Sequence, residues 1–230
     1  TKKQGGRNVW TGVVKQDADA LEIPLRRRKP TMYFVNSMSD LFHKDVPFEY
    51  VDRVFAIMAL APQHTFQVLT KRPERMAKYL LREQPGVCGQ DKSAPGFVAK
   101  ESIAEQVYKW HEAQAPDAYR ISNKLPVHPL NVGENLRHWK TWPLPNVWLG
   151  VSIEDQERAD QRREAFGEVI AAVKFVSYEP ALSAVDWVGW EFLNWMIIGG
   201  ESGHGARPFD VAWARSSIEW CRANAVAPFV

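Results

Sequence analysis

Cysteine is scarce in this chain, and the scarcity excludes whole classes of protein. Two cysteines among 230 residues, Cys88 and Cys221, can build neither a disulfide framework nor a metal cluster on their own. The chain also lacks a recognisable signal peptide and any apolar run long enough to cross a bilayer. We therefore expect a cytoplasmic protein that has no membrane partner and holds no metal through its own side chains.

Charge of a single sign is lacking as well. The 29 basic and 27 acidic residues are interspersed and leave a formal net charge of +2, so bulk electrostatics do not indicate a nucleic-acid partner. The one basic run, at 26–29, is typical of a solvated connector, because no aromatic side chains alternate with its charges. Binding of phosphate groups by this run is the alternative interpretation.

The chain is rich, by contrast, in short apolar runs that end in polar residues. Runs with many β-branched and aromatic residues and turn signals at both ends predict strands buried in a parallel sheet. Three of them each lead into a glutamate, and they are 147–151 before Glu154, 173–177 before Glu179 and 195–199 before Glu201. Further strands are predicted at 31–36, at 65–70 and from Phe229 onward.

Helical patterns separate these strands. Helices are predicted from about Pro47 to Pro62, from 71 to 83, from 155 to 167 and from Asp210 onward. Strands and helices that alternate at this spacing predict an α/β fold, a partial (β/α) barrel of the TIM type. An open doubly wound sheet is the alternative, although no glycine-rich nucleotide-binding loop follows the first strand.

One domain over 1–230 accounts for the whole chain, with an insertion at 84–145. The insertion is rich in glycine and proline and interrupts the alternation of strands and helices, with one helix predicted at about 99–113. Residues 1–30 are predicted to be irregular, apart from a short extended piece at 8–14.

Polar residues at the strand ends form the candidate site, because parallel strands collect their chemistry at their C-terminal ends. The set contains carboxylates, cations, hydroxyls and a glycine pair, namely Asn36, Ser37, Ser39, Asp40, Thr70, Lys71, Arg72, Ser152, Glu154, Ser177, Glu179, Gly199, Gly200, Glu201 and Arg207. Such a mixture suits a polar, zwitterionic or nucleotide-like ligand. Ser39, Asp155 and Asp210 are more simply explained as helix caps.

Two smaller patterns have simpler explanations than a functional site. Asp40, His43 and Asp45 resemble metal ligands, but no second cluster at ligand spacing accompanies them. Cys221 shares a helical face with Val211 and other apolar residues, so we expect a buried side chain without a catalytic role.

Several longer strings of residues together resemble a known family. They are 34–43, 69–76, 146–154, 175–180, 198–203 and 206–208. The chain is similar in these strings to the phage "gp thirty-seven/gp sixty-eight" family of phage and bacterial proteins, which is grouped with radical S-adenosylmethionine (SAM) proteins. The matches cover most of 25–226 apart from the insertion. Tyr178 and the pair Ser183 and Ala184 depart from the residues more usual in the family.

The resemblance implies a partial barrel in which three closely spaced cysteines hold a [4Fe-4S] cluster beside SAM. This chain lacks the first strand and the cysteine loop, which in the family lie upstream of the position of Thr1. The candidate SAM contacts are Asn36, Ser37, Lys71, Ser152 and Glu154. Lys71 would hold the SAM carboxylate, and carboxylates and hydroxyls would hold its amino group and ribose. The residues expected to face the substrate are Glu179, Glu201 and Arg207.

Three functions follow as hypotheses. The first is a radical-SAM-like enzyme of phage or prophage type, acting on an unknown substrate such as a nucleic acid or a partner protein. The second is a metal-free barrel hydrolase that uses two of Glu154, Glu179 and Glu201 as acid and base or nucleophile. The third is a non-catalytic module, in which the insertion and the basic run at 26–29 bind a protein partner or a nucleic acid.

Overall fold

The computed structural model describes residues 2–4, 7–9, 13–37, 39–81, 103, 105–106 and 142–230. Most of the predicted insertion therefore lies outside the described residues, and so do Cys88 and nearly all of the helix predicted at 99–113. The first described elements are a short antiparallel pair, β1 (Lys2–Gln4) and β2 (Arg7–Val9). The extended piece predicted at 8–14 overlaps β2 at its first residues.

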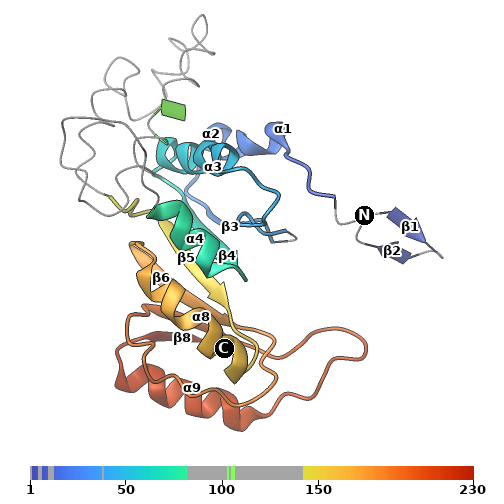
Figure 1. Cartoon of the computed structure of the whole chain (residues 1–230), viewed down its shortest axis with the longest axis vertical. Coiled ribbons are helices and arrows are strands. Elements are labelled where there is room, and N and C mark those ends of the chain that lie inside the picture. Colours follow the sequence, from blue (N-terminus) through green and yellow to red (C-terminus); the bar gives the residue numbers. More distant parts are fainter. Residues whose placement is uncertain are drawn as a thin grey trace, which may run out of the picture.

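Six parallel strands form the sheet that organises the described chain (Figure 1). In chain order they are β3 (Met32–Val35), β4 (Thr65–Thr70), β5 (Val147–Ser152), β6 (Val173–Tyr178), β7 (Trp195–Ile198) and β8 (Ala227–Phe229). Their order in space equals their order in the chain, and every neighbouring pair is parallel. The predicted α/β class is confirmed.

The sequential strand order bears on the two predicted architectures. A doubly wound sheet reverses the direction in which strands are added at a switch point in the middle. No such reversal occurs among the six described strands, because each new strand is added next to the previous one in the same direction. The order of the described strands therefore does not match the doubly wound alternative, and the structure is a mixed α/β fold with an all-parallel six-stranded sheet.

Helices cover one face of this sheet. The longer ones are α3 (Phe48–Leu60), α4 (Pro73–Leu80), α8 (Gln156–Glu168) and α9 (Val211–Ala223). Right-handed connections between consecutive parallel strands place successive helices on the same face, and Figure 1 shows α4 and α8 in front of β4 to β6. Asp155 and Asp210 cap α8 and α9 as predicted, whereas Ser39 precedes no helix, since α3 begins after Pro47.

Residues 13–30 are more ordered than predicted. They contain two short helices, α1 (Ala18–Leu21) and α2 (Ile23–Arg26), and the carboxylate of Asp17 caps α1 by accepting a bond from the N–H of Ala20. Helices this short are not stable alone. The buried ring of His64 anchors the segment, because its Nε2 lies 3.0 Å from a main-chain carbonyl oxygen of α2 and 3.0 Å from that of Arg27.

The opposite face of the sheet is aromatic. Phe175 neighbours Gly150 in register, and a methyl group at position 150 would overlap the ring of Phe175, so only glycine fits there. The ring of Trp195 lies 5.2 Å from Phe175 and 5.8 Å from Trp148, measured between centroids. Trp148 and Trp195 thus pack against Phe175, but both are half-buried and lie outside the main core cluster, so the prediction of core packing holds for them only in part.

Candidate functional site

The loop after β3 is attached to the end of β4 by one carboxylate, that of Asp40. This carboxylate accepts hydrogen bonds from Thr70 Oγ1 at 2.7 Å and from Arg72 Nη1 at 2.6 Å. It also accepts from the main-chain N–H groups of Phe42 at 2.9 Å and Lys71 at 3.3 Å. These four donors already bond to the Asp40 carboxylate, so it fixes the loop after β3 to the end of β4 and is not oriented for a metal ion.

The ends of β4 and β5 meet at Glu154, which is 8% exposed. One carboxylate oxygen lies 2.5 Å from Lys71 Nζ, and the other lies 2.8 Å from Arg162 Nη1 on α8. Arg162 also donates to the main-chain oxygen of Ser152 at 2.6 Å. Two cations thus share one carboxylate, and this part of the rim keeps a positive charge. The side chain of Lys71 is 58% exposed and can reach a ligand.

Glu179, at the end of β6, lies next to this cluster. The N–H of Leu182 donates to the main-chain oxygen of Glu154 at 2.9 Å, which ties the loop after β6 to the end of β5. The Glu179 side chain is exposed and packs over Gly199, where a methyl group would come within 3.2 Å of the carboxyl carbon. Within the described part of the chain, no hydrogen bond or ion pair holds its carboxylate.

The third predicted glutamate, Glu201, lies in the loop after β7 and, unlike Glu179, is bonded to an arginine. Arg207 Nε and Nη2 donate to the two carboxylate oxygens of Glu201 at 2.7 and 2.8 Å, and the Arg207 N–H adds a third bond at 2.9 Å. These bonds from the guanidinium and then from the main chain lower the pKa of Glu201 to about 2. Two of the three residues predicted to face a substrate, Glu201 and Arg207, therefore bond to each other.

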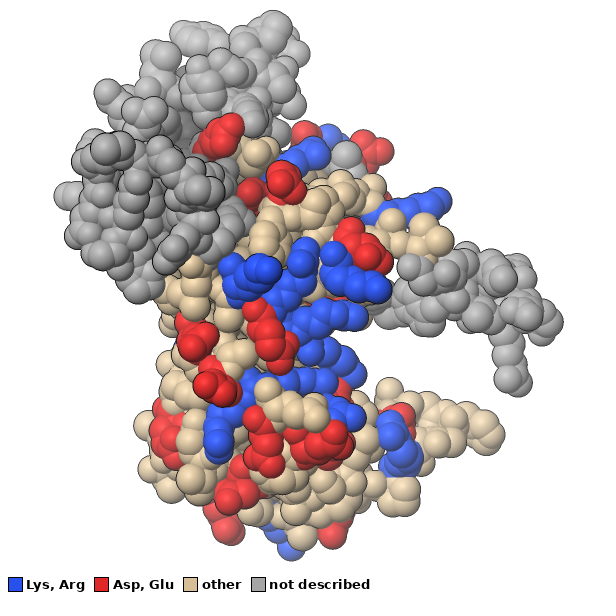
Figure 2. All heavy atoms as spheres, viewed as in Figure 1, with Lys and Arg blue, Asp and Glu red and all other residues tan. Residues whose placement is uncertain are grey.

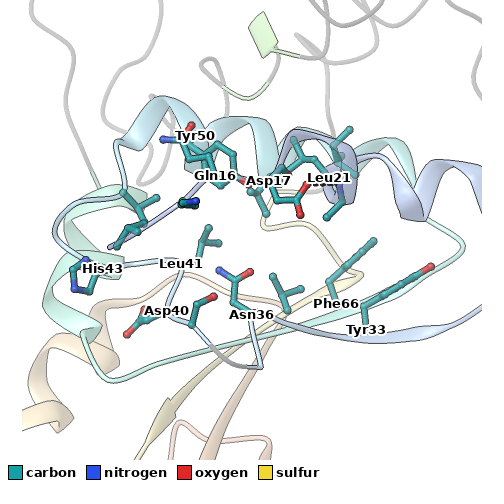
Figure 3. A pocket seen from close by; sticks show the side chains of 18 of the residues that line it. Gln16, Asp17, Leu21, Tyr33, Asn36, Asp40, Leu41, His43, Tyr50 and Phe66 are labelled. Carbon is teal, nitrogen blue, oxygen red and sulfur yellow. Dashed lines mark hydrogen bonds between the residues drawn. The ribbon is translucent and has the colours of Figure 1, made fainter. Parts of the chain in front are cut away.

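Asn36 and Ser37 follow β3 and lie apart from the charged cluster, since the described contacts do not join either side chain to Lys71 or Glu154. Asn36 has a left-handed backbone, with φ of 59°, a conformation that asparagine tolerates better than most residues. Its side chain lines a cavity of about 730 Å³ on the helix-covered side of β3 (Figure 3). Of the five predicted SAM contacts, Lys71 and Glu154 are the two that an ion pair joins among the described residues.

The surface around the rim carries both signs of charge. In Figure 2, Lys and Arg side chains gather over the middle of the face where α4 and α8 lie, with Asp and Glu side chains beside them. Several of these charges are paired, as in Arg158 with Glu157 at 2.5 Å. In the basic run at 26–29 all four residues are exposed, and Arg26 pairs with Glu22 at 3.1 Å. This pattern does not form a continuous surface of one sign.

Cysteine supplies no cluster ligand in the described structure. Cys221 is fully buried, its sulfur lies 3.7 Å from that of Met196, and burial raises the pKa of its thiol to about 11. The prediction of a buried cysteine is confirmed. Nowhere in the described part of the chain do three or more His, Cys, Asp or Glu side chains gather in a group suited to a metal ion.

The whole chain, residues 1–230, matches the family described as "Protein of unknown function (DUF5131)". The chain belongs to this family. No curated protein and no solved structure matches it. Among the described residues, no helix is both long and apolar enough to cross a membrane. For this DUF5131 member, function must therefore be argued from the site itself.

Sequence reasoning missed Arg162 and undervalued Asp40 and Arg72 as rim residues. Arg162 lies two turns into α8, where the pattern shows only a charged, solvated helix with no strong apolar face. Its position seven residues after the cap Asp155 puts it on the same face of the helix as the cap, and this spacing was the available signal. The partner across the rim, however, depends on how the strands pair.

Proposed function

We propose that this chain binds SAM at the C-terminal edge of its sheet, as the cofactor-binding part of a radical-SAM-like enzyme with a partial (β/α) barrel. One observation carries the proposal. The ends of three adjacent strands present a surplus cation, Lys71 after β4, paired with Glu154 after β5, and the carboxylate of Glu179 after β6, which has no partner among the described residues. A zwitterionic ligand requires groups of both signs of this kind. SAM is such a ligand, with a carboxylate, an ammonium group and a sulfonium charge.

The cationic half of the site suits the SAM carboxylate. Lys71 and Arg162 carry two positive charges and share the single negative charge of Glu154. A second carboxylate, that of the ligand, would balance the remaining positive charge. Arg162 is held, because its side chain is only 11% exposed and bonds twice to the rim. Lys71 is therefore the group that turns toward the ligand, through a charge-assisted hydrogen bond.

The anionic half suits the positive groups of SAM. Glu179 is exposed and, among the described residues, has no partner that a ligand must displace. The absence of a side chain at Gly199 makes room for the Glu179 carboxylate itself, which packs over this residue. Ser152 and Ser177 are neighbours in register, and Glu179 follows Ser177 by two residues, so these side chains share one face of the sheet. Both serines are 5% exposed, so a ribose hydroxyl group would have to reach them from the rim above.

The barrel part of the proposal rests on strand order. Consecutive parallel strands with right-handed connections curl toward a barrel when each is added on the same side. The aromatic layer of Trp148, Phe175 and Trp195 on the face opposite the helices resembles the filled interior of such a barrel.

The residues present do not fit a [4Fe-4S] cluster. Cluster ligation takes several thiolates, whereas the printed chain has two cysteines, of which Cys221 is buried with a raised thiol pKa. The proposal for these residues is therefore confined to binding and orienting SAM, and no step is assigned to the cluster.

The paired-glutamate hydrolase receives less support. It needs two available carboxyl groups, one of them able to carry a proton. Glu154 is held between two cations, and Glu201 is held by Arg207 with its pKa at about 2. Glu179 is left as the one available glutamate of the three.

Isothermal titration of the chain with SAM and with S-adenosylhomocysteine tests the proposal. We expect Glu179→Gln and Lys71→Ala each to weaken SAM binding by roughly 10- to 100-fold, the effect of one charge-assisted contact. S-adenosylhomocysteine lacks the sulfonium charge, so the wild type should prefer SAM, and Glu179→Gln should lose most of that preference.

Matched controls come from the same elements. Glu164→Gln on α8 and Lys78→Ala on α4 change the same charges at exposed positions away from the strand ends, and both should bind SAM like the wild type. Failure of the wild type to bind SAM, or equal affinities for Glu179→Gln and Glu164→Gln, would refute the proposal.

A further inference from the structure

A second site is suggested by the cavity beside β3, which the SAM proposal does not use. It measures about 730 Å³, within the usual range for small-molecule sites. It lies on the side of β3 that faces α3, and residues 13–24 form its other wall (Figure 3). Its lining does not include Lys71, Glu154 or Glu179, which carry the SAM proposal, although Asp40 and Arg72 of the rim line one end of it.

The body of the cavity is apolar and flat on one side. Tyr33 and Phe66, neighbours in register on β3 and β4, stack with centroids 5.4 Å apart and planes 12° apart. Figure 3 shows both rings reaching up from the sheet side of the cavity. Val54 and Ile57 of α3 and Leu21 of α1 line it as well. A flat, uncharged ring would bury its faces here.

The polar end of the cavity is formed by Asn36. Its amide points into the cavity in Figure 3, and within the described residues no hydrogen bond occupies it. A side-chain amide offers a donor and an acceptor next to each other. Of the charged residues that line the cavity, Asp40 and Arg72 pair with each other at 2.6 Å, whereas Lys15 and Asp17 lie at exposed positions on the opposite wall. The ligand group that matches the Asn36 amide itself is neutral and pairs a donor with an acceptor.

We propose that this cavity binds a small, neutral heteroaromatic molecule that has an amide-like edge. Its ring lies against Tyr33 and Phe66, and its edge bonds to the amide of Asn36. The proposal does not rest on SAM binding, since the two sites have separate linings. Asp40 is the one residue that lines the cavity and also bonds to the main chain of Lys71.

Nicotinamide is a suitable probe, because it is flat and neutral and carries a carboxamide. Ligand-observed NMR should detect binding to the wild type, with Kd of about 1 mM for a fragment of this size. Asn36→Gly keeps the left-handed backbone but removes the amide, and it should weaken nicotinamide at least 10-fold while leaving toluene, which has no polar edge, unaffected. Saturating SAM should not displace the probe.

A second variant fills the cavity instead of removing its polar end. Ile57→Phe adds volume on the α3 wall and should weaken both nicotinamide and toluene, whereas Val188→Phe, at a position 63% exposed, should weaken neither. Thermal melting of each variant shows that it is folded. The proposal is overturned if the wild type does not bind nicotinamide, or if Asn36→Gly and Ile57→Phe bind it like the wild type.

Discussion

The two ends of the parallel strands use polar side chains in different ways. At the N-terminal ends, a polar residue directly precedes each of three strands: His64 before β4, Asn146 before β5 and Asn194 before β7. Each one bonds to main-chain groups of another segment. At this end, polar side chains complete the backbone hydrogen bonding of the fold.

At the C-terminal ends, polar side chains bond mostly to one another. Asp40 pairs with Arg72 and Glu154 with Lys71, which leaves charges that ligands can share. Glu179 stands beside them without a partner among the described residues. The proposed function adds a division of roles to this contrast, with stability at one end of the sheet and binding at the other, as in (β/α) barrels.

Replacing His64 should give the largest difference in stability between variants at the two ends of the strands. Its Nδ1 accepts a hydrogen bond from the N–H of Thr31 at 3.2 Å, so Nε2 carries the proton for the carbonyl groups of residues 24–27. His64→Ala removes these hydrogen bonds and leaves a cavity in place of a ring that is 1% exposed, so it should lower the free energy of unfolding by about 3 kcal/mol. Thermal melting should show this as a fall in Tm of roughly 6 to 12 °C.

Two further variants serve as controls for the His64→Ala measurement. His204→Ala removes an exposed histidine from the loop after β7, and Glu179→Gln changes the rim. Both should alter the free energy of unfolding by less than about 0.5 kcal/mol. A Glu179→Gln variant as unstable as His64→Ala would show that the rim is structural and would remove the contrast.

Asn146 offers a smaller effect at the same end. Its Nδ2 donates to the main-chain oxygens of Met58 at 2.9 Å and Ala61 at 3.4 Å, which are the last carbonyl groups of α3. Asn146→Ala should lower the free energy of unfolding by about 1 to 2 kcal/mol. Asn146→Asp should cost more in chemical denaturation, because a carboxylate would then face two carbonyl oxygens. The reverse order would show that the asparagine is not a donor to α3.

The sequence predicts five of the six strands close to their observed bounds, whereas the sixth, predicted from Phe229 onward, ends at that residue. The run at 65–70 lies between His64 and Lys71 and half of it is β-branched, so the predicted strand has the observed ends. Burial of both faces leaves such a run few other conformations. The caps Asp155 and Asp210 were predicted for the same reason, because capping depends only on the neighbouring N–H groups.

The contacts of the site were harder to predict, because they depend on distant segments. Arg162 contacts Glu154 only after α8 has packed over β5. The spacing in the sequence shows on which helical face Arg162 lies, but it does not show that Glu154 is its partner. The cavity was missed because residues 13–30 were predicted to be irregular, whereas α1 and α2 are held in place by His64 from 37 to 40 residues away in the sequence. Their order comes from tertiary contacts, which overrule weak local propensity.

The smallest expected effect concerns the ion pair of Glu201 and Arg207, at the C-terminal end of the strands. Hydrogen bonds from Arg207 lower the Glu201 pKa from its ordinary value of 4.5 to about 2. The pair therefore stabilises the loop fully above pH 4.5, and this contribution is lost as the pH falls toward 2. Carboxyl-carbon NMR should show Glu201 titrating near pH 2, and Arg207→Ala should return its pKa toward 4.5.

Arg215→Ala, which removes an exposed arginine from α9, should leave the Glu201 pKa unchanged. Because a carboxyl group with a pKa of about 2 cannot supply a proton near neutral pH, this titration also tests the chemistry of the rim. A Glu201 pKa near 4.5 in the wild type would show that the pair is not formed in solution. Glu201 would then join Glu179 as an available carboxylate, and a pair of acids at this end of the sheet would again have to be considered.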